Sequence, residues 1–123
     1  MKGTILIVDD EVQITENLKI ILRKHAGEIL VSNNPHHALE LIRNNKIHCV
    51  ISDIYMPEMS GFELIKLVRE HNIDVPFIFF SASEREELKA EASKYNHATF
   101  VTKPSIPELV KMLGPMLQLG LDL

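Results

Sequence analysis

Residues 4–11 read TILIVDDE, an apolar run suited to a buried β-strand that ends at once in Asp9, Asp10 and Glu11. A short, continuous run of Ile, Leu and Val is typical of a strand buried on both faces of a sheet. The acidic residues allow two interpretations. They can begin a solvent-exposed helix, because carboxylates favour a helix N-terminus, or they can form part of a cation site.

The rest of the chain repeats this alternation of short apolar runs and longer amphipathic stretches. Strands that alternate with helices form right-handed crossovers and a parallel sheet covered by helices on both faces. We therefore predict an α/β fold with strands at residues 4–8, 28–31, 48–52, 76–80 and 98–101.

Apolar residues spaced three or four apart predict the helices between these strands. A further helix over residues 84–95 has a weaker apolar face, so we expect it to be held most loosely. The predicted inner faces are Ile14, Leu18, Ile21 and Leu22; Ala38, Leu41 and Ile42; Phe62, Ile65 and Val68; Leu88, Ala92 and Tyr95; and Leu109, Leu113 and Met116.

Composition narrows the class of protein. The 123 residues suit one domain, and the net charge of −4, without a basic run, disfavours direct nucleic-acid binding. The sequence has neither a signal peptide nor an apolar run long enough for a membrane helix, so a cytoplasmic location is expected. Cys49 lies in an apolar run and is interpreted as a buried thiol, and the six histidines as surface residues.

Polar residues follow four of the five predicted strands, where ligands bind to a parallel sheet. Asp9 and Asp10 follow the first strand, Asp53 the third, Ser81 the fourth and Lys103 the fifth. Clustered carboxylates repel one another unless a cation or protons intervene, and oxygen ligands suit Mg²⁺. The hydroxyl and the ammonium group suit an anion. Together they predict a place where a phosphoryl group lies beside a metal ion.

These motifs resemble the receiver domain of two-component response regulators. The resemblance covers nearly the whole chain, through ILIVDDE, VISDIYMPEMSGFELIKLVR, PFIFFSAS and FVTKPS. It implies a flavodoxin-like doubly wound (βα)5 sandwich with strand order 2-1-3-4-5. It also implies a single receiver domain over residues 1–123, with no output domain in this chain.

The resemblance assigns roles at the predicted site. Asp53 is expected to accept a phosphoryl group from a phosphohistidine of a histidine kinase or phosphotransfer protein. Asp10 would be the main carboxylate on Mg²⁺ and Asp9 would hold metal-bound water, while Asp53 and the backbone carbonyl of Tyr55 would complete the protein ligands. Lys103 would pair with the phosphoryl oxygens.

The resemblance also implies a conformational switch. Ser81 would hydrogen-bond the attached phosphoryl group, and Phe100 would change rotamer on activation. The fourth helix, fifth strand and fifth helix would then contact a downstream protein or an attached output domain, and a homodimer is a further expected assembly. Tyr55 is bulky beside the acceptor, which bears on the lifetime of the phosphoryl group.

Several local features are expected as well. The Lys103-Pro104 peptide matches a cis bond of the family. Ser105 and Glu108 have the spacing of a capping box. Asn96 stands where the family usually has glycine, and we expect it to adopt the left-handed conformation there.

Two other functions remain open. One is a Mg²⁺-dependent phosphohydrolase of similar fold that works through an aspartyl phosphate. Such enzymes usually carry a second acid two residues beyond the nucleophile, where this chain has Tyr55. The other is a degenerate receiver that only binds partners, which is disfavoured because every acceptor-site residue is present.

Overall fold

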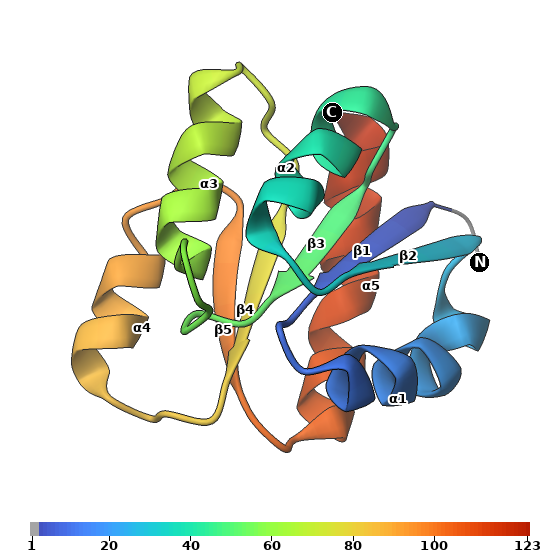
Figure 1. Cartoon of the computed structure of the whole chain (residues 1–123). Coiled ribbons are helices and arrows are strands. Elements are labelled where there is room, and N and C mark those ends of the chain that lie inside the picture. Colours follow the sequence, from blue (N-terminus) through green and yellow to red (C-terminus); the bar gives the residue numbers. More distant parts are fainter. Residues whose placement is uncertain (1–2) are drawn as a thin grey trace.

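The computed structural model describes residues 3–123 as a five-stranded parallel sheet between two helical layers (Figure 1). The strand order is β2-β1-β3-β4-β5, which confirms the predicted doubly wound topology. Every strand lies within one residue of its predicted bounds. The strands are β1 (Thr4–Val8), β2 (Glu28–Ser32), β3 (Cys49–Ser52), β4 (Phe77–Ser81) and β5 (Ala98–Thr102).

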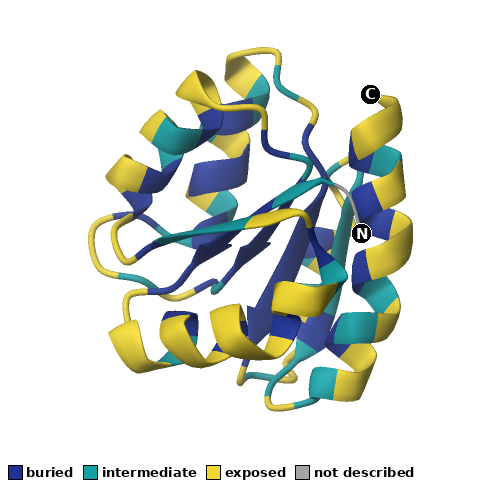
Figure 2. Cartoon of the chain, turned by 90° about the vertical axis from the view of Figure 1, so that its right-hand side faces the viewer, coloured by how far each residue is buried: buried dark blue, intermediate teal, exposed yellow. Residues whose placement is uncertain are grey.

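The helices form two layers with separate apolar cores. One layer contains α1 and α5, and the other contains α2, α3 and α4 (Figure 1). The central strands β1, β3 and β4 are almost entirely buried, the edge strands β2 and β5 are mostly half-buried, and the outer helical faces are exposed (Figure 2). The helices are α1 (Val12–Leu22), η1 (Arg23–His25), α2 (Pro35–Asn44), α3 (Gly61–Glu70), α4 (Glu86–Ala92) and α5 (Ile106–Asp122).

Helix α1 buries fewer of the predicted inner-face residues than expected. Leu18 and Leu22 are buried against the sheet, but Ile21 is 41% exposed. The helix lies beside β2, the edge strand, so only part of its circumference is covered (Figure 1). Val12 and Ile20 are exposed on the same helix.

Helix α4 is shorter than the predicted 84–95. It buries Leu88 and Ala92 but ends there, because the next residues form tight turns. The predicted left-handed residue was wrong: His97, with φ 56°, adopts this conformation instead of Asn96. The His97 carbonyl accepts from Phe77 N–H at 2.8 Å where β4 and β5 begin to pair, which places the chain reversal at this residue.

The predicted capping box is also misplaced. Ser105 is the N-cap of α5, but its side chain makes no capping hydrogen bond. Pro107 offers no N–H in that first turn. The capping box instead begins α3, where Ser60 Oγ accepts from Glu63 N–H at 3.1 Å and Glu63 Oε1 accepts from Ser60 N–H at 2.9 Å. The cis Lys103-Pro104 bond is confirmed.

The cysteine and three of the six histidines behave as expected. Cys49 is fully buried, and burial raises the pKa of its thiol far above the ordinary value. His36, His37 and His71 are exposed. His25, His48 and His97 are instead partly buried, and His48 Nδ1 accepts from the Thr4 N–H at 2.9 Å. Within residues 3–123, no helix is both long and apolar enough to cross a bilayer.

Candidate functional site

The turn from β1 into α1 carries the first two carboxylates. Asp9 continues the sheet by one residue, because its N–H donates to the Ser32 carbonyl at 3.1 Å. Its side chain is buried, and its Oδ1 accepts from the Glu11 N–H at 2.9 Å. Asp10 is exposed at the top of this turn. The two neighbouring acids therefore differ in role: one braces the turn and the other faces solvent.

Asp53 follows β3 and is held by backbone contacts on both sides. Its N–H donates to the Val8 carbonyl at 2.9 Å, and its Oδ1 accepts from the Ile54 N–H at 2.7 Å. The following loop returns closely to this strand end. Gly61 N–H donates to the Ile54 carbonyl at 2.8 Å, and a Cβ on Gly61 would lie 2.3 Å from the Asp53 carbonyl oxygen. Only glycine allows this approach, which fixes the backbone beneath Asp53.

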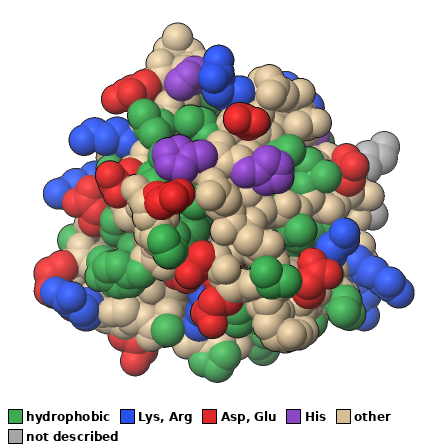
Figure 3. All heavy atoms as spheres, viewed as in Figure 1, with side chains coloured by type: hydrophobic (Ala, Val, Ile, Leu, Met, Phe, Trp, Pro, Cys, Tyr) green, Lys and Arg blue, Asp and Glu red, His purple; other side chains and the backbone are tan. Residues whose placement is uncertain are grey.

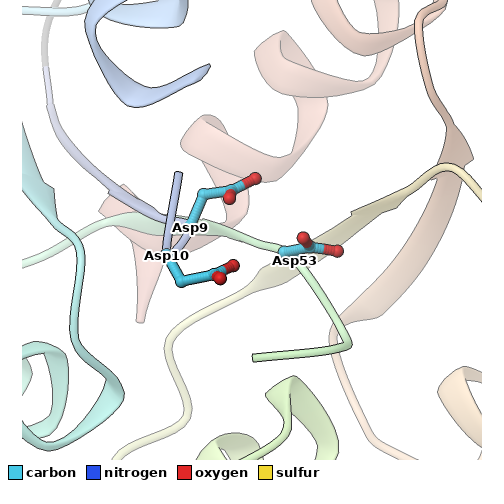
Figure 4. A group of neighbouring side chains, drawn as sticks. All are labelled: Asp9, Asp10 and Asp53. Carbon is cyan, nitrogen blue, oxygen red and sulfur yellow. The ribbon is translucent and has the colours of Figure 1, made fainter. Parts of the chain in front are cut away.

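The three carboxylates converge as the sequence predicts (Figure 4). Asp9, Asp10 and Asp53 each offer an oxygen within 4.8 Å of the others. Lys103 enters the same site from the end of β5. Its Nζ lies 2.8 Å from Asp9 Oδ2 and 3.4 Å from Asp53 Oδ2, and the Lys103, Asp9 and Asp53 side chains are 15%, 3% and 13% exposed.

This crowding shifts the ionisation of the site. Burial raises the pKa of Asp53 above its ordinary value, and the charge of Asp9 adds to the effect, while Lys103 and the Ile54 N–H only partly offset it. Burial lowers the pKa of Lys103, but its hydrogen bond to Asp9 and the charges of Asp53 and Asp9 raise that pKa above its ordinary value. Lys103 is therefore a cation at neutral pH and neutralises part of the cluster.

A hard divalent cation fits this donor set. The converging atoms of Asp9, Asp10 and Asp53 are all carboxylate oxygens, which Mg²⁺ prefers over nitrogen or sulfur. Lys103 balances only one of their charges, so the cluster still attracts a cation. Around the periphery of the face in Figure 3, Lys and Arg side chains are dispersed without forming one continuous patch.

The remaining predicted residues lie around this cluster. Ser81 ends β4 and is buried, and its Oγ accepts from the Ser83 N–H at 3.3 Å. Phe100 is half-buried on β5 and borders a hollow of about 740 Å³ between α4, β5 and α5, which Lys89 and Glu108 also line. The Tyr55 side chain is 57% exposed in the loop after β3.

Sequence reasoning missed two polar residues that contact the acidic turn. Asn33 Nδ2 donates to the Asp9 carbonyl at 2.8 Å and to Thr15 Oγ1 at 3.0 Å. Asn33 follows β2 directly, so the same rule that singled out the other strand ends points to it. Thr15 gave no such signal, because it lies within an amphipathic helix.

Comparison with known proteins decides the family. The family model for the response regulator receiver domain matches residues 5–114. The chain belongs to this family. It is a receiver domain of two-component response regulators, and the acidic cluster fits the phosphoacceptor site of such domains.

Relatives and solved structures agree with this assignment. The receiver domain is 34% identical over 110 residues to the transcriptional regulatory protein SrrA of Staphylococcus aureus, covering 89% of this chain and 45% of SrrA. The chain thus spans about half the length of the curated relatives it matches. The receiver domain of the Francisella response regulator 1452 superimposes with a TM-score of 0.86 at 30% identity, covering 94% of this chain and 97% of that chain. The response regulator TrrA from Thermotoga maritima, in complex with Mg²⁺-BeF, gives a TM-score of 0.72 at 29% identity, covering 90% and 98%.

Proposed function

We propose that this receiver domain accepts a phosphoryl group on Asp53 in a Mg²⁺-dependent reaction and changes a protein-binding surface in response. One observation carries the proposal: Asp9, Asp10 and Asp53 converge within 4.8 Å, with Lys103 in contact with Asp9 and Asp53. A site built only for stability would not gather three carboxylates around one lysine, since each added like charge opposes folding.

The carboxylates of Asp9, Asp10 and Asp53 are proposed to hold Mg²⁺, with Asp10 as the main ligand, Asp9 acting through metal-bound water, and the backbone carbonyl of Tyr55 completing the set. When bound, the ion supplies positive charge beside the phosphoryl oxygens. The complex of Thermotoga maritima TrrA with Mg²⁺-BeF supports this ligand for a related receiver.

The reaction follows from the positions of Asp53 and Lys103. A carboxylate oxygen of Asp53 attacks the phosphorus of a phosphohistidine, so an O–P bond forms while the N–P bond breaks and the imidazole takes up a proton. Lys103 Nζ, 3.4 Å from Asp53 Oδ2, is close enough to donate to an oxygen of the transferred group. Attack by water on the same phosphorus returns Asp53 and inorganic phosphate, so the domain also switches itself off.

The partners are proposed on chemical grounds. The donor is a histidine kinase or a phosphotransfer protein, and the output is a downstream protein or an attached domain, with a homodimer as a further assembly. We propose a signalling switch rather than an enzyme with a separate substrate. The position two residues after Asp53 is occupied by Tyr55, which lacks the carboxyl group that such phosphohydrolases usually carry there.

Labelling with a small phosphodonor tests the reaction. Acetyl phosphate should add one phosphoryl group, measured by intact mass, when Mg²⁺ is present and should add none after chelation. Asp53→Asn should abolish the labelling, because an amide is a poor nucleophile. Undiminished labelling of this variant would show that Asp53 is not the acceptor.

The switch is tested through Ser81, which lies at the end of β4 and directly before the loop into α4. Ser81→Ala should still accept phosphate but should lose the phosphorylation-dependent hydrogen-exchange change across residues 89–100. Ser93→Ala is a matched control, because Ser93 is an exposed serine that bonds only within its own turn, to the Ala90 carbonyl at 2.7 Å. If wild-type changes stay within residues 9–12 and 53–60, the proposed switch is wrong.

A further inference from the structure

The turn that presents Asp9 and Asp10 leads into a helix with a weak start. Glu11 is the N-cap of α1, and its side chain makes no capping hydrogen bond. An uncapped helix start leaves N–H donors unpaired and allows the first turn to fray. Two of the three proposed ligands, Asp9 and Asp10, lie immediately before this first turn, so contacts from outside α1 must help to hold it in place.

Asn33 provides this support from the β2–α2 loop. Its Nδ2 donates to the Asp9 carbonyl at 2.8 Å and to Thr15 Oγ1 at 3.0 Å, and Thr15 Oγ1 donates to the Val12 carbonyl at 2.9 Å. The donor directions are unambiguous. A carbonyl can only accept, and the Thr15 hydroxyl already donates its proton to the Val12 carbonyl. The Asn33 amide nitrogen must therefore be the donor to both the Asp9 carbonyl and Thr15 Oγ1. Hydrogen bonds chained in this way strengthen one another.

Asn33 is itself anchored on a firmly held loop. Ser32 Oγ donates to the Asn34 carbonyl at 2.8 Å. The Asn34 side chain caps α2, accepting from the N–H groups of His36 and His37 at 2.8 and 3.1 Å. The loop therefore keeps a fixed geometry, and Asn33 transmits that geometry to the β1–α1 turn.

We infer that Asn33 is a positioning residue for the cation site, acting through the Asp9 backbone and Thr15 rather than as a ligand. This inference rests on the proposed function, in which Asp9, Asp10 and Asp53 hold Mg²⁺. Without Asn33 the turn gains freedom that the ion must remove on binding. Loss of two neutral hydrogen bonds from an accessible side chain should raise the dissociation constant for Mg²⁺ by about threefold to tenfold.

Calorimetric titration with Mg²⁺ tests this on four proteins: wild type, Asn33→Ala, Thr15→Val and the control Asn45→Ala. Asn45 is also an exposed asparagine that donates to one backbone carbonyl, that of Leu41 at 3.1 Å, at the far end of α2. Asn33→Ala and Thr15→Val should weaken Mg²⁺ binding and Asn45→Ala should not. The double variant Asn33→Ala/Thr15→Val should have a dissociation constant for Mg²⁺ no higher than the higher of the two single-variant values, because both residues act in one chain of hydrogen bonds.

A second readout separates positioning from loss of a ligand. At saturating Mg²⁺, labelling of Asn33→Ala by acetyl phosphate should proceed within about twofold of the wild-type rate, since every proposed ligand remains. An unchanged dissociation constant in Asn33→Ala, or an equal rise in Asn45→Ala, would overturn the inference while leaving the proposed function intact. If Asp10→Ala instead binds Mg²⁺ with the same dissociation constant as the wild type, the proposed metal site is refuted, and this inference with it.

Discussion

Replacing Lys103 by methionine removes the ammonium group that contacts Asp9 and Asp53 while keeping a side chain of similar length. Lys103 Nζ lies 2.8 Å from Asp9 Oδ2 and 3.4 Å from Asp53 Oδ2, and all three side chains are largely buried. At an effective dielectric constant of about 20, two unit charges about 4 Å apart attract by about 4 kcal/mol, and desolvation of Lys103 opposes part of this. We expect the free energy of unfolding to fall by about 2–4 kcal/mol in the absence of divalent cations.

Urea unfolding followed by circular dichroism at neutral pH, in chelator, measures this loss. The midpoint should fall while the slope with denaturant stays constant, because the substitution changes a charge and not the surface exposed on unfolding. Lys94→Met is the matched control. Lys94 also pairs with a carboxylate, with Nζ 3.0 Å from Glu91 Oε1, but its side chain is 69% exposed, so its removal should change stability little.

Adding Mg²⁺ gives the experiment its second arm. A cation that binds only the folded state stabilises it by mass action, and Lys103→Met leaves more uncompensated charge to attract it. Mg²⁺ should therefore stabilise Lys103→Met more than it stabilises the wild type. If Lys103→Met loses no more stability than Lys94→Met, or if Mg²⁺ stabilises Lys103→Met less than the wild type, then Lys103 does not neutralise the acidic cluster.

Three further results are expected. Burial raises the pKa of Asp53 in the folded state above its ordinary 3.8, so the folded state loses stability as the pH rises from the unfolded-state pKa to the folded-state pKa. Asp53→Asn should therefore be more stable than wild type at neutral pH, and urea unfolding as a function of pH should show this difference vanishing below about pH 4. Asp10→Ala should raise the melting temperature of the metal-free protein by relieving repulsion, yet abolish the rise that millimolar Mg²⁺ produces in wild type; a full remaining response would show that Asp10 is not the main ligand. Arg69 donates from Nη1 to the Ile73 and Val75 carbonyls at 3.0 and 2.9 Å and from Nη2 to the Asn96 carbonyl at 2.8 Å. Arg69→Met should lower the unfolding free energy by about 2 kcal/mol in denaturant titrations, and an unchanged midpoint would argue against these bonds.

Strand positions and the acidic cluster could be predicted because both depend on local pattern. A buried parallel strand is an apolar run, and its last residue marks the edge of the sheet, so the run before Asp9 and the run before Asp53 placed both acids at one edge. The carboxylates then converge because parallel strands end at the same edge of the sheet, and no knowledge of individual side-chain contacts is needed to predict this.

Features decided by individual hydrogen bonds could not be predicted in the same way. The spacing of Ser105 and Glu108 matches that of Ser60 and Glu63, yet only the second pair forms a capping box. Likewise, the left-handed residue before β5 is set by where pairing with Phe77 begins. Asn33 had a local signal, its place after β2, but its partners Asp9 and Thr15 come from a different part of the chain.

We propose that Asp53, and not its acidic neighbours, carries the phosphoryl group. Borohydride reduces an aspartyl phosphate to homoserine, so treatment of the acetyl phosphate-labelled protein marks the acceptor permanently. Peptide mapping by mass spectrometry should then find homoserine at position 53, only in samples labelled with Mg²⁺, and aspartate unchanged at positions 9 and 10. Homoserine at position 9 or 10, or its absence from position 53 in labelled protein, would show that Asp53 is not the phosphoacceptor.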